Sequence, residues 1–92
     1  MGKSIHSPEY GLLLALLRQL REDVGLTQTS LAERLGRPQT FVSKSELGER
    51  RLDLEELRQL CSALDLGLVE VVERWLGSLP SARKARTRRP SR

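Results

Sequence analysis

Three glycines divide the first half of the chain into short segments, and this division limits the folds that the chain can adopt. Gly25, Gly36 and Gly48 each follow a segment with a helical pattern. A glycine at such a point is typical of a helix end, because glycine adopts a left-handed backbone without steric cost. We therefore predict three successive helices that end at these glycines.

Capping residues and prolines mark the beginnings of these helices. Ser7 before Pro8 has the pattern of an N-cap followed by a proline at the first helical position. Thr27 is a suitable N-cap for the second helix, and Pro38 can begin the third helix but cannot lie inside it. The predicted helices cover residues 8–24, 28–35 and 38–47.

Two more helices are predicted in the second half of the chain. Asp53 followed by Glu56 is typical of a capping box, and a stripe of apolar residues comes next, namely Leu54, Leu57, Leu60, Cys61 and Leu64. A fifth helix fits residues 68–76. Because no segment has the alternating pattern of a strand, we predict an all-α fold with a five-helix domain over residues 1–77 and a disordered, flexible basic tail over residues 78–92.

The positive charge is concentrated in that tail. The chain has 16 Lys and Arg and 12 Asp and Glu residues, a net charge of +4. Residues 81–92 hold six of the basic residues and no acidic residue, so the first eighty residues carry ten basic and twelve acidic side chains. A nucleic-acid surface on the folded part must therefore come from the arrangement of side chains. The tail is either a solvated end or a non-specific phosphate-binding element.

Composition excludes several classes of protein. A single Cys cannot form an internal disulfide, and a single His cannot build a zinc site. No apolar run approaches the ~20 residues of a membrane span. Arg18 and Arg21 interrupt the leucine-rich segment near the N-terminus, which does not fit a signal peptide. Because no phosphate-binding glycine loop or nucleophile–base set is present, we expect a cytoplasmic non-enzyme without a metal, cofactor or membrane partner.

The third predicted helix has a polar face of short side chains. A rotation of about 100° per residue places Gln39, Thr40, Ser43 and Lys44 on one side, and Phe41, Val42 and Ser45 on the other. Gln pairs with an adenine edge, Thr offers a methyl group to thymine, and Lys reaches guanine or phosphate. Each residue taken alone also fits an ordinary solvated face. At the start of the second helix, Thr27 and Gln28 leave amide donors that can receive a phosphate.

These features together resemble the lambda-repressor-like family of helix-turn-helix proteins, also called the Cro or XRE type. The resemblance covers about residues 12–76. It rests on "GLTQTSLAERLG", on "FVSKSELGERRLDLEEL", and on the family's spacing of four residues, Gln28, Ala32, Gly36 and Val42. It implies that the second and third helices form the helix-turn-helix. The polar face of the third helix then lies in the major groove.

The resemblance also implies roles for residues outside that face. Gln28 would clamp a phosphate or position Gln39, and Arg50 and Arg51 would touch phosphates from the loop after the third helix. A homodimer would bind a two-fold operator with half-sites about one helical turn apart. The family's packing brings the first helix near the end of the third, so we expect a partly buried ion pair between Arg21 and Glu46.

Three positions depart from the family pattern. Ser45 stands where a large apolar residue is usual, which removes core packing from the third helix. Leu47 replaces a residue that is commonly polar. Ser30 stands where an acidic residue often completes a capping box with Thr27, so we expect a weak cap on the second helix. None of these changes is expected to alter the fold, because other apolar residues remain.

The predicted fifth helix has apolar residues around too much of its circumference for one buried stripe. A second partner surface is therefore implied. We predict a dimer interface made of Val69, Val72, Trp75 and Leu76. The alternative is that the tail or the first helix covers this patch. Cys61, which lies in the stripe of the fourth helix, is expected to be a buried apolar residue rather than a redox group.

The sequence thus predicts a regulator that binds specific sites on double-stranded DNA as a homodimer and has no chemistry of its own. The rival hypothesis is a protein-interaction module, such as an antitoxin, for which DNA binding is secondary. Small proteins of the family that the chain resembles are used in both ways. A co-purifying second chain would favour the rival.

Overall fold

The computed structural model describes residues 7–80, which form five α-helices and contain no strand. The helices are α1 (Pro8–Asp23), α2 (Gln28–Leu35), α3 (Gln39–Leu47), α4 (Leu54–Ala63) and α5 (Leu68–Ser78). The predicted all-α, five-helix fold is confirmed. Pro38 is the N-cap of α3 rather than its first helical residue.

Gly36 and Gly48 end α2 and α3 in the left-handed conformation, as predicted. Their φ angles are 69° and 81°. At the first of these ends, the Gly36 N–H donates to the Glu33 carbonyl and the Arg37 N–H donates to the Ala32 carbonyl. These bonds satisfy carbonyls that the helix leaves without intrahelical donors, and they turn the chain sharply into α3.

The expected weakness of the α2 cap is not seen, because Ser30 completes the capping box. The Thr27 N–H donates to Ser30 Oγ at 2.9 Å, and the Ser30 N–H donates to Thr27 Oγ1 at 3.0 Å. A serine hydroxyl thus accepts the bond that a carboxylate would otherwise accept. At α4, Asp53 and Glu56 form the capping box that the sequence predicted.

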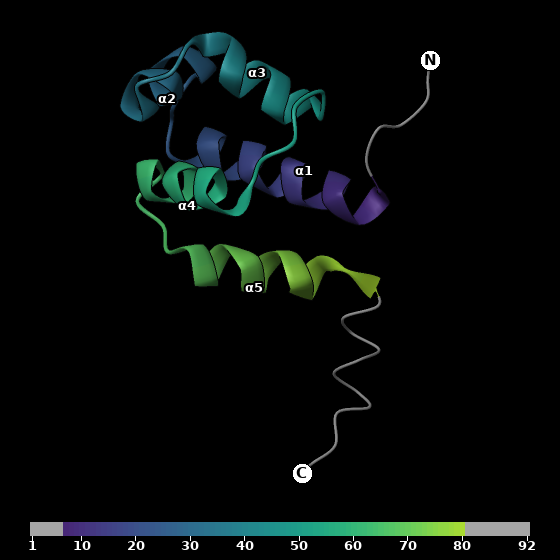
Figure 1. Cartoon of the computed structure of the whole chain (residues 1–92). Helices are drawn as coiled ribbons and strands as arrows, with labels where there is room; N and C mark the ends of the chain where they lie inside the picture. Colours follow the sequence, from purple (N-terminus) through teal and green to yellow (C-terminus); the bar gives the residue numbers. More distant parts are fainter. Residues whose placement is uncertain (1–6, 81–92) are drawn as a thin grey trace.

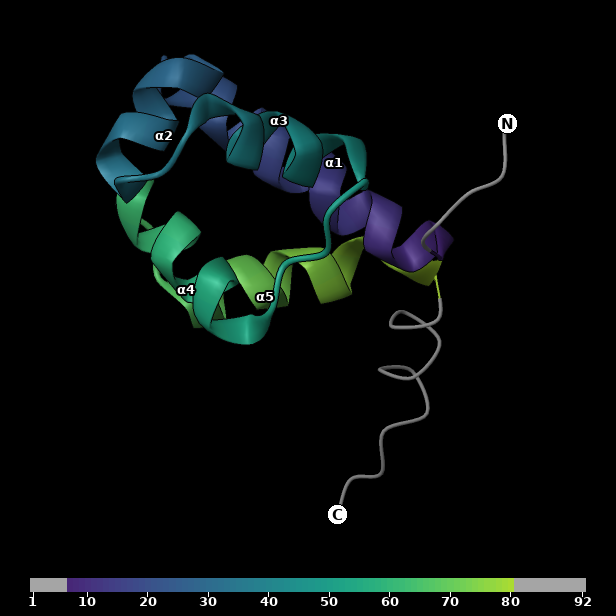
Figure 2. The same ribbon diagram turned by 45° about the horizontal axis from the view of Figure 1, so that its top comes forward.

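The helix pair α2–α3 and helix α5 lie on opposite sides of the molecule (Figures 1 and 2). Helix α1 runs between them, and α5 lies beside α1 with the opposite chain direction (Figure 1). The core is formed where the helices meet, by apolar residues that are almost fully buried, among them Leu17, Leu31, Val42, Leu64 and Val71. This arrangement leaves the outer sides of α3 and α5 uncovered by the rest of residues 7–80.

The C-terminal end of the folded part lies later than the sequence predicted. Helix α5 continues to Ser78, and the next residue, Leu79, is 7% exposed. The helix therefore extends beyond residue 76, the predicted end, and a buried leucine follows it directly. Ser78, the first residue of the predicted tail, is thus the last residue of α5, and residues 81–92 of that tail lie outside the described residues. No helix between residues 7 and 80 is long and apolar enough to cross a membrane.

Candidate nucleic-acid interface

Helix α3 has the two faces that its sequence predicted. Phe41, Val42 and Ser45 are buried. On the other side, Gln39, Thr40 and Lys44 are exposed and Ser43 is half-buried. The four candidate base-reading side chains therefore share the outward face of one helix.

The structure joins the first residue of α3 to the first residue of α2. Gln39 Nε2 donates to Gln28 Oε1 at 2.9 Å. The sequence left two roles open for Gln28, a phosphate clamp or a support for Gln39, and this bond is what the second role requires. Gln28 is half-buried, whereas Gln39 is exposed. The bond restricts the rotamers of the Gln39 side chain, which nevertheless stays exposed to solvent.

The predicted ion pair between Arg21 and Glu46 is confirmed. Arg21 Nε donates to Glu46 Oε2 at 2.6 Å, and Arg21 Nη2 donates to Glu46 Oε1 at 3.1 Å. Only 8% of the Arg21 side chain and 12% of the Glu46 side chain are exposed. The hydrogen bond to Glu46 raises the pKa of Arg21 above its ordinary value, although burial acts in the opposite direction. The pair connects the end of α1 to α3.

Glu46 makes one further contact that the sequence did not reveal. Gln28 Nε2 donates to Glu46 Oε1 at 2.9 Å. The two residues lie 18 positions apart and on different helices. No local spacing signals such a bond, which depends on the packing of α2 against α3.

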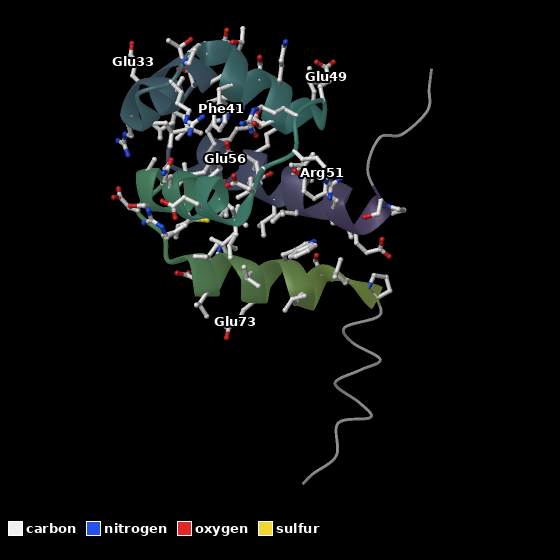
Figure 3. All side chains as sticks on the ribbon, in the orientation of Figure 1. Glu33, Phe41, Glu49, Arg51, Glu56 and Glu73 are labelled. Atoms are coloured by element: carbon white, nitrogen blue, oxygen red, sulfur yellow. The ribbon has the colours of Figure 1, made fainter. Side chains whose placement is uncertain are left out.

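Arg50 and Arg51 were both predicted to touch phosphate, but their surroundings differ. Arg50 Nη1 and Nη2 donate to the two carboxylate oxygens of Glu56 at 2.9 and 2.6 Å, and the guanidinium lies 4.7 Å from the centre of the Phe41 ring. Arg51 is exposed, and its guanidinium lies 4.4 Å from the centre of the Tyr10 ring. Figure 3 shows Phe41 and Glu56 between α3 and α4, and Arg51 beside α1. Arg50 therefore holds the loop to α4, whereas Arg51 remains open to a ligand.

The Phe41 ring also carries a second cation that the sequence analysis missed. The Arg37 guanidinium lies 4.4 Å from the centre of that ring. Its Nη1 is 3.9 Å from Glu56 Oε2. Arg37 belongs to the turn between α2 and α3, so these contacts fix the turn to α3 and α4. The sequence does place Arg37 directly after Gly36, in the turn of the helix-turn-helix, and this position could have marked it as a residue that fixes the turn.

The four residues of the predicted dimer patch do not have equal exposure. Val69 and Leu76 are 69% and 44% exposed, and Val72 is half-buried. Trp75 Nε1 donates to the Glu9 carbonyl at 2.7 Å, and its ring packs against the core. The first helix therefore covers part of Trp75, which stays half-buried. A tryptophan is wide enough to bridge two helices, and here it anchors α5 to α1.

The core contains two small buried residues with polar side-chain atoms, Ser45 on α3 and Cys61 on α4. Ser45 is 2% exposed, and its hydroxyl has no hydrogen-bond partner within residues 7–80. It lines a cavity of about 10 Å³ together with Leu14, Leu31 and Leu52, at the position where the sequence predicts a loss of packing. Cys61 is fully buried, and burial raises the pKa of its thiol, which agrees with an apolar role. No group of side chains within residues 7–80 has the composition of a metal site.

Comparison with known proteins gives consistent results. The chain matches the family model of the helix-turn-helix domain over residues 12–75. It is similar to the structure of an XRE-family like protein from Pseudomonas syringae pv. tomato str. DC3000, with 42% identity, a TM-score of 0.76, and coverage of 83% of this chain and 93% of that chain. The clp gene regulator ClgR from C. glutamicum is 30% identical with a TM-score of 0.70, over 80% and 96% of the two chains.

A third similar structure shares the fold at lower identity. The restriction-modification controller protein C.Esp1396I is 22% identical with a TM-score of 0.72, over 78% of this chain and 94% of that chain. No curated protein matches the chain.

The sharp turn at Gly36 and the outward face of α3 define a helix-turn-helix DNA-binding domain. The family match extends over most of the chain and over all the residues of that motif. The chain therefore belongs to the Cro/XRE-type helix-turn-helix family, and it is a DNA-binding regulator rather than an enzyme.

Proposed function

We propose that this protein regulates transcription by binding specific sites on double-stranded DNA as a homodimer, with α3 in the major groove. The bond between Gln39 and Gln28 carries this proposal. An exposed glutamine that is already held at its amide group loses less side-chain entropy when it pairs with an adenine edge. Thr40, Ser43 and Lys44 extend the same face, where they supply a methyl group, hydroxyls and a cation.

Contacts to the DNA backbone are assigned to the start of α2 and to the loop before α4. The capping box engages the amides of Thr27 and Ser30, which leaves the amides of Gln28 and Thr29 as donors for a phosphate. We assign a second phosphate to Arg51, which is exposed. Arg50 supports the loop because its guanidinium donates to Glu56 and to the Arg51 carbonyl. Only its remaining N–H groups could donate to a phosphate. These contacts would orient α3 without reading sequence.

The proposed dimer uses one flank of α5. Val69, Val72 and Leu76 recur at helical spacing, so they form a single apolar stripe beside the buried side of the helix. The other flank carries Glu70 and Arg74, which form an ion pair at 3.0 Å. Association through the apolar flank would remove exposed valine and leucine side chains from water. We leave Trp75 out of the proposed interface because its indole N–H already binds the Glu9 carbonyl of α1.

Selection of bound sites from a pool of random duplexes tests the proposal. We expect enrichment of a palindromic motif with half-sites about one helical turn apart. Gln39→Ala should weaken binding to that motif by about 1–3 kcal/mol and relax the preference at one position of each half-site. Gln59→Ala, which changes a glutamine on α4, is the matched control and should leave both unchanged.

The same experiment separates DNA recognition from the rival function. A pool without enrichment, together with a second protein chain that co-purifies, would assign the protein to the protein-interaction class. The name of the C. glutamicum protein, a regulator of the clp gene, supports the DNA-binding alternative at 30% identity over 80% of this chain.

A further inference from the structure

The Glu46 carboxylate connects the buried ion pair to the two glutamines of the proposed DNA interface. It accepts hydrogen bonds from Arg21 at 2.6 and 3.1 Å and from Gln28 at 2.9 Å. Gln28 in turn accepts from Gln39 at 2.9 Å. Four side chains from α1, α2 and α3 therefore form one continuous chain of hydrogen bonds from the protein interior to the outward face of α3.

The chemistry of Glu46 fixes the direction of every bond in this chain. A carboxylate that forms an ion pair accepts hydrogen bonds and does not donate them, and the Glu46 carboxylate is paired with the Arg21 guanidinium. Gln28 must therefore turn its NH₂ group toward Glu46, so that its carbonyl oxygen points away. That oxygen can only accept, and it therefore orients the NH₂ group of Gln39 toward Gln28.

The orientation of Gln39 determines which base edge it matches. Its NH₂ group gives one hydrogen to Gln28, which leaves one hydrogen and the carbonyl oxygen for a ligand. Adenine offers one acceptor, N7, and one donor, the N6 amino group, so it matches this remaining set. Guanine offers two acceptors, N7 and O6, and would place O6 against the carbonyl oxygen of Gln39.

We propose that Glu46 is a positioning residue for base recognition, which acts through Gln28 to hold Gln39 in the one amide orientation that selects adenine over guanine. This inference rests on the proposed function, because it requires Gln39 to face a base. Without Glu46, the Gln28 amide is free to turn over and present its NH₂ group to Gln39. Gln39 then turns over as well and offers both of its amide hydrogens to the acceptors of guanine.

The ratio of affinities for two duplexes measures this effect. One duplex carries the motif selected from the random pool. The other carries guanine in place of adenine at the position where Gln39→Ala relaxes the preference. We expect the unchanged protein to prefer adenine by about tenfold or more. Glu46→Gln, which has the same size but can also donate, should reduce this preference to about threefold or less.

Two further variants separate positioning from folding. Gln28→Ala removes the intermediate link and leaves the ion pair between Arg21 and Glu46 intact, so it should lower the preference to a similar extent in a stable protein. Glu22→Gln removes another carboxylate close to Arg21, at 4.0 Å, which is 46% exposed and does not contact Gln28. This matched control should retain the full preference for adenine. Urea unfolding of each variant establishes that it is folded under the binding conditions.

The side-chain amide signals of Gln28 and Gln39 in an NMR spectrum of the DNA-free protein provide a readout that does not depend on binding. Both pairs of signals should shift in Glu46→Gln and stay in place in Glu22→Gln. Unchanged amide signals in Glu46→Gln would overturn the positioning role of Glu46 and leave the proposed function untouched. A preference for adenine that survives both Glu46→Gln and Gln28→Ala would have the same consequence. A random pool with no enriched motif would instead overturn the proposed function, and the inference with it.

Discussion

Arg50 and Glu56 join the loop after α3 to the first turn of α4 through a bidentate pair, with Nη2 to Oε2 at 2.6 Å and Nη1 to Oε1 at 2.9 Å. The same Glu56 carboxylate accepts from the Asp53 N–H at 3.0 Å and thereby closes the capping box of α4. One side chain thus caps a helix and anchors the loop that holds Arg51. The loop conformation is therefore coupled to the protonation state of Glu56.

This coupling predicts acid sensitivity. The hydrogen bonds from Arg50, followed by the bond from the Asp53 backbone, lower the pKa of Glu56 from 4.5 to about 2. Since the pKa is lower in the folded state, the stability that Glu56 contributes is complete above about pH 4.5 and is lost as the pH falls toward 2. Urea unfolding between pH 2 and 6 should show this loss, and Glu56→Gln should make the free energy of unfolding less dependent on pH.

Glu55 provides the matched control for that experiment. Its hydrogen bonds with Arg58, and then with Gln59, lower its pKa to about 2 as well, but 59% of its side chain is exposed. Water screens such a pair, so Glu55→Gln should change the pH dependence less than Glu56→Gln does. Equal effects of the two variants would show that the capping box adds nothing to an ordinary surface ion pair.

The ion pair between Arg21 and Glu46 should be costly to break but simple to replace. Arg21→Met leaves a carboxylate with little solvent exposure and without its cation, and we predict that this lowers the free energy of unfolding by about 3 kcal/mol. The double variant Arg21→Met with Glu46→Leu removes both charges and should recover most of that loss. A double variant that is no more stable than Arg21→Met would contradict this account of the pair.

Ser45 should be a site where a smaller side chain increases stability. Its hydroxyl is buried without a partner among residues 7–80, and alanine avoids the cost of desolvating that group. We predict that Ser45→Ala raises the free energy of unfolding by about 1 kcal/mol. Ser43→Ala is the control, because that serine lies on the outward face of the same helix. A destabilised Ser45→Ala would indicate that a water molecule occupies the cavity of about 10 Å³ and binds the hydroxyl.

The helices were predictable because their signals are local. Ser7, Thr27 and Asp53 cap helices within a few residues, and Gly36 and Gly48 end them through their own backbone conformation. The outward face of α3 was predictable for the same reason, since one helical period determines it. The end of α5 was missed because the burial of Leu79 depends on tertiary packing rather than on helix periodicity.

Side-chain partners across helices were only partly predictable. The family's packing indicated the bond between Arg21 and Glu46, but the bond between Glu46 and Gln28 depends on the rotamers of both residues. Sequence likewise cannot distinguish an arginine that is bound to Glu56 from one that is open to a ligand. Trp75 fits a dimer patch and an intramolecular anchor equally well until the position of α1 is known.

The apolar flank of α5 should control self-association. We predict that Val69→Glu and Leu76→Glu shift the protein from dimer to monomer, because a charge in an apolar interface loses its hydration without gaining a partner. Sedimentation velocity measures the change in mass. Arg74→Ala, on the opposite flank, is the control and should remain dimeric. A dimer that persists in both glutamate variants would place the interface elsewhere.

Arg51 and Arg50 should respond differently to removal, although they are neighbours in sequence. Arg51 is exposed, so Arg51→Ala should leave stability nearly unchanged and weaken binding to all duplexes alike. Loss of one phosphate contact per protomer should reduce the slope of log affinity against log salt by ~0.9 for each contact. Arg50→Ala should instead lower the free energy of unfolding, because it removes the partner of Glu56 at the cap of α4. Fluorescence anisotropy between 50 and 200 mM salt measures the slope, and an unchanged slope for Arg51→Ala would show that the loop does not reach the DNA backbone.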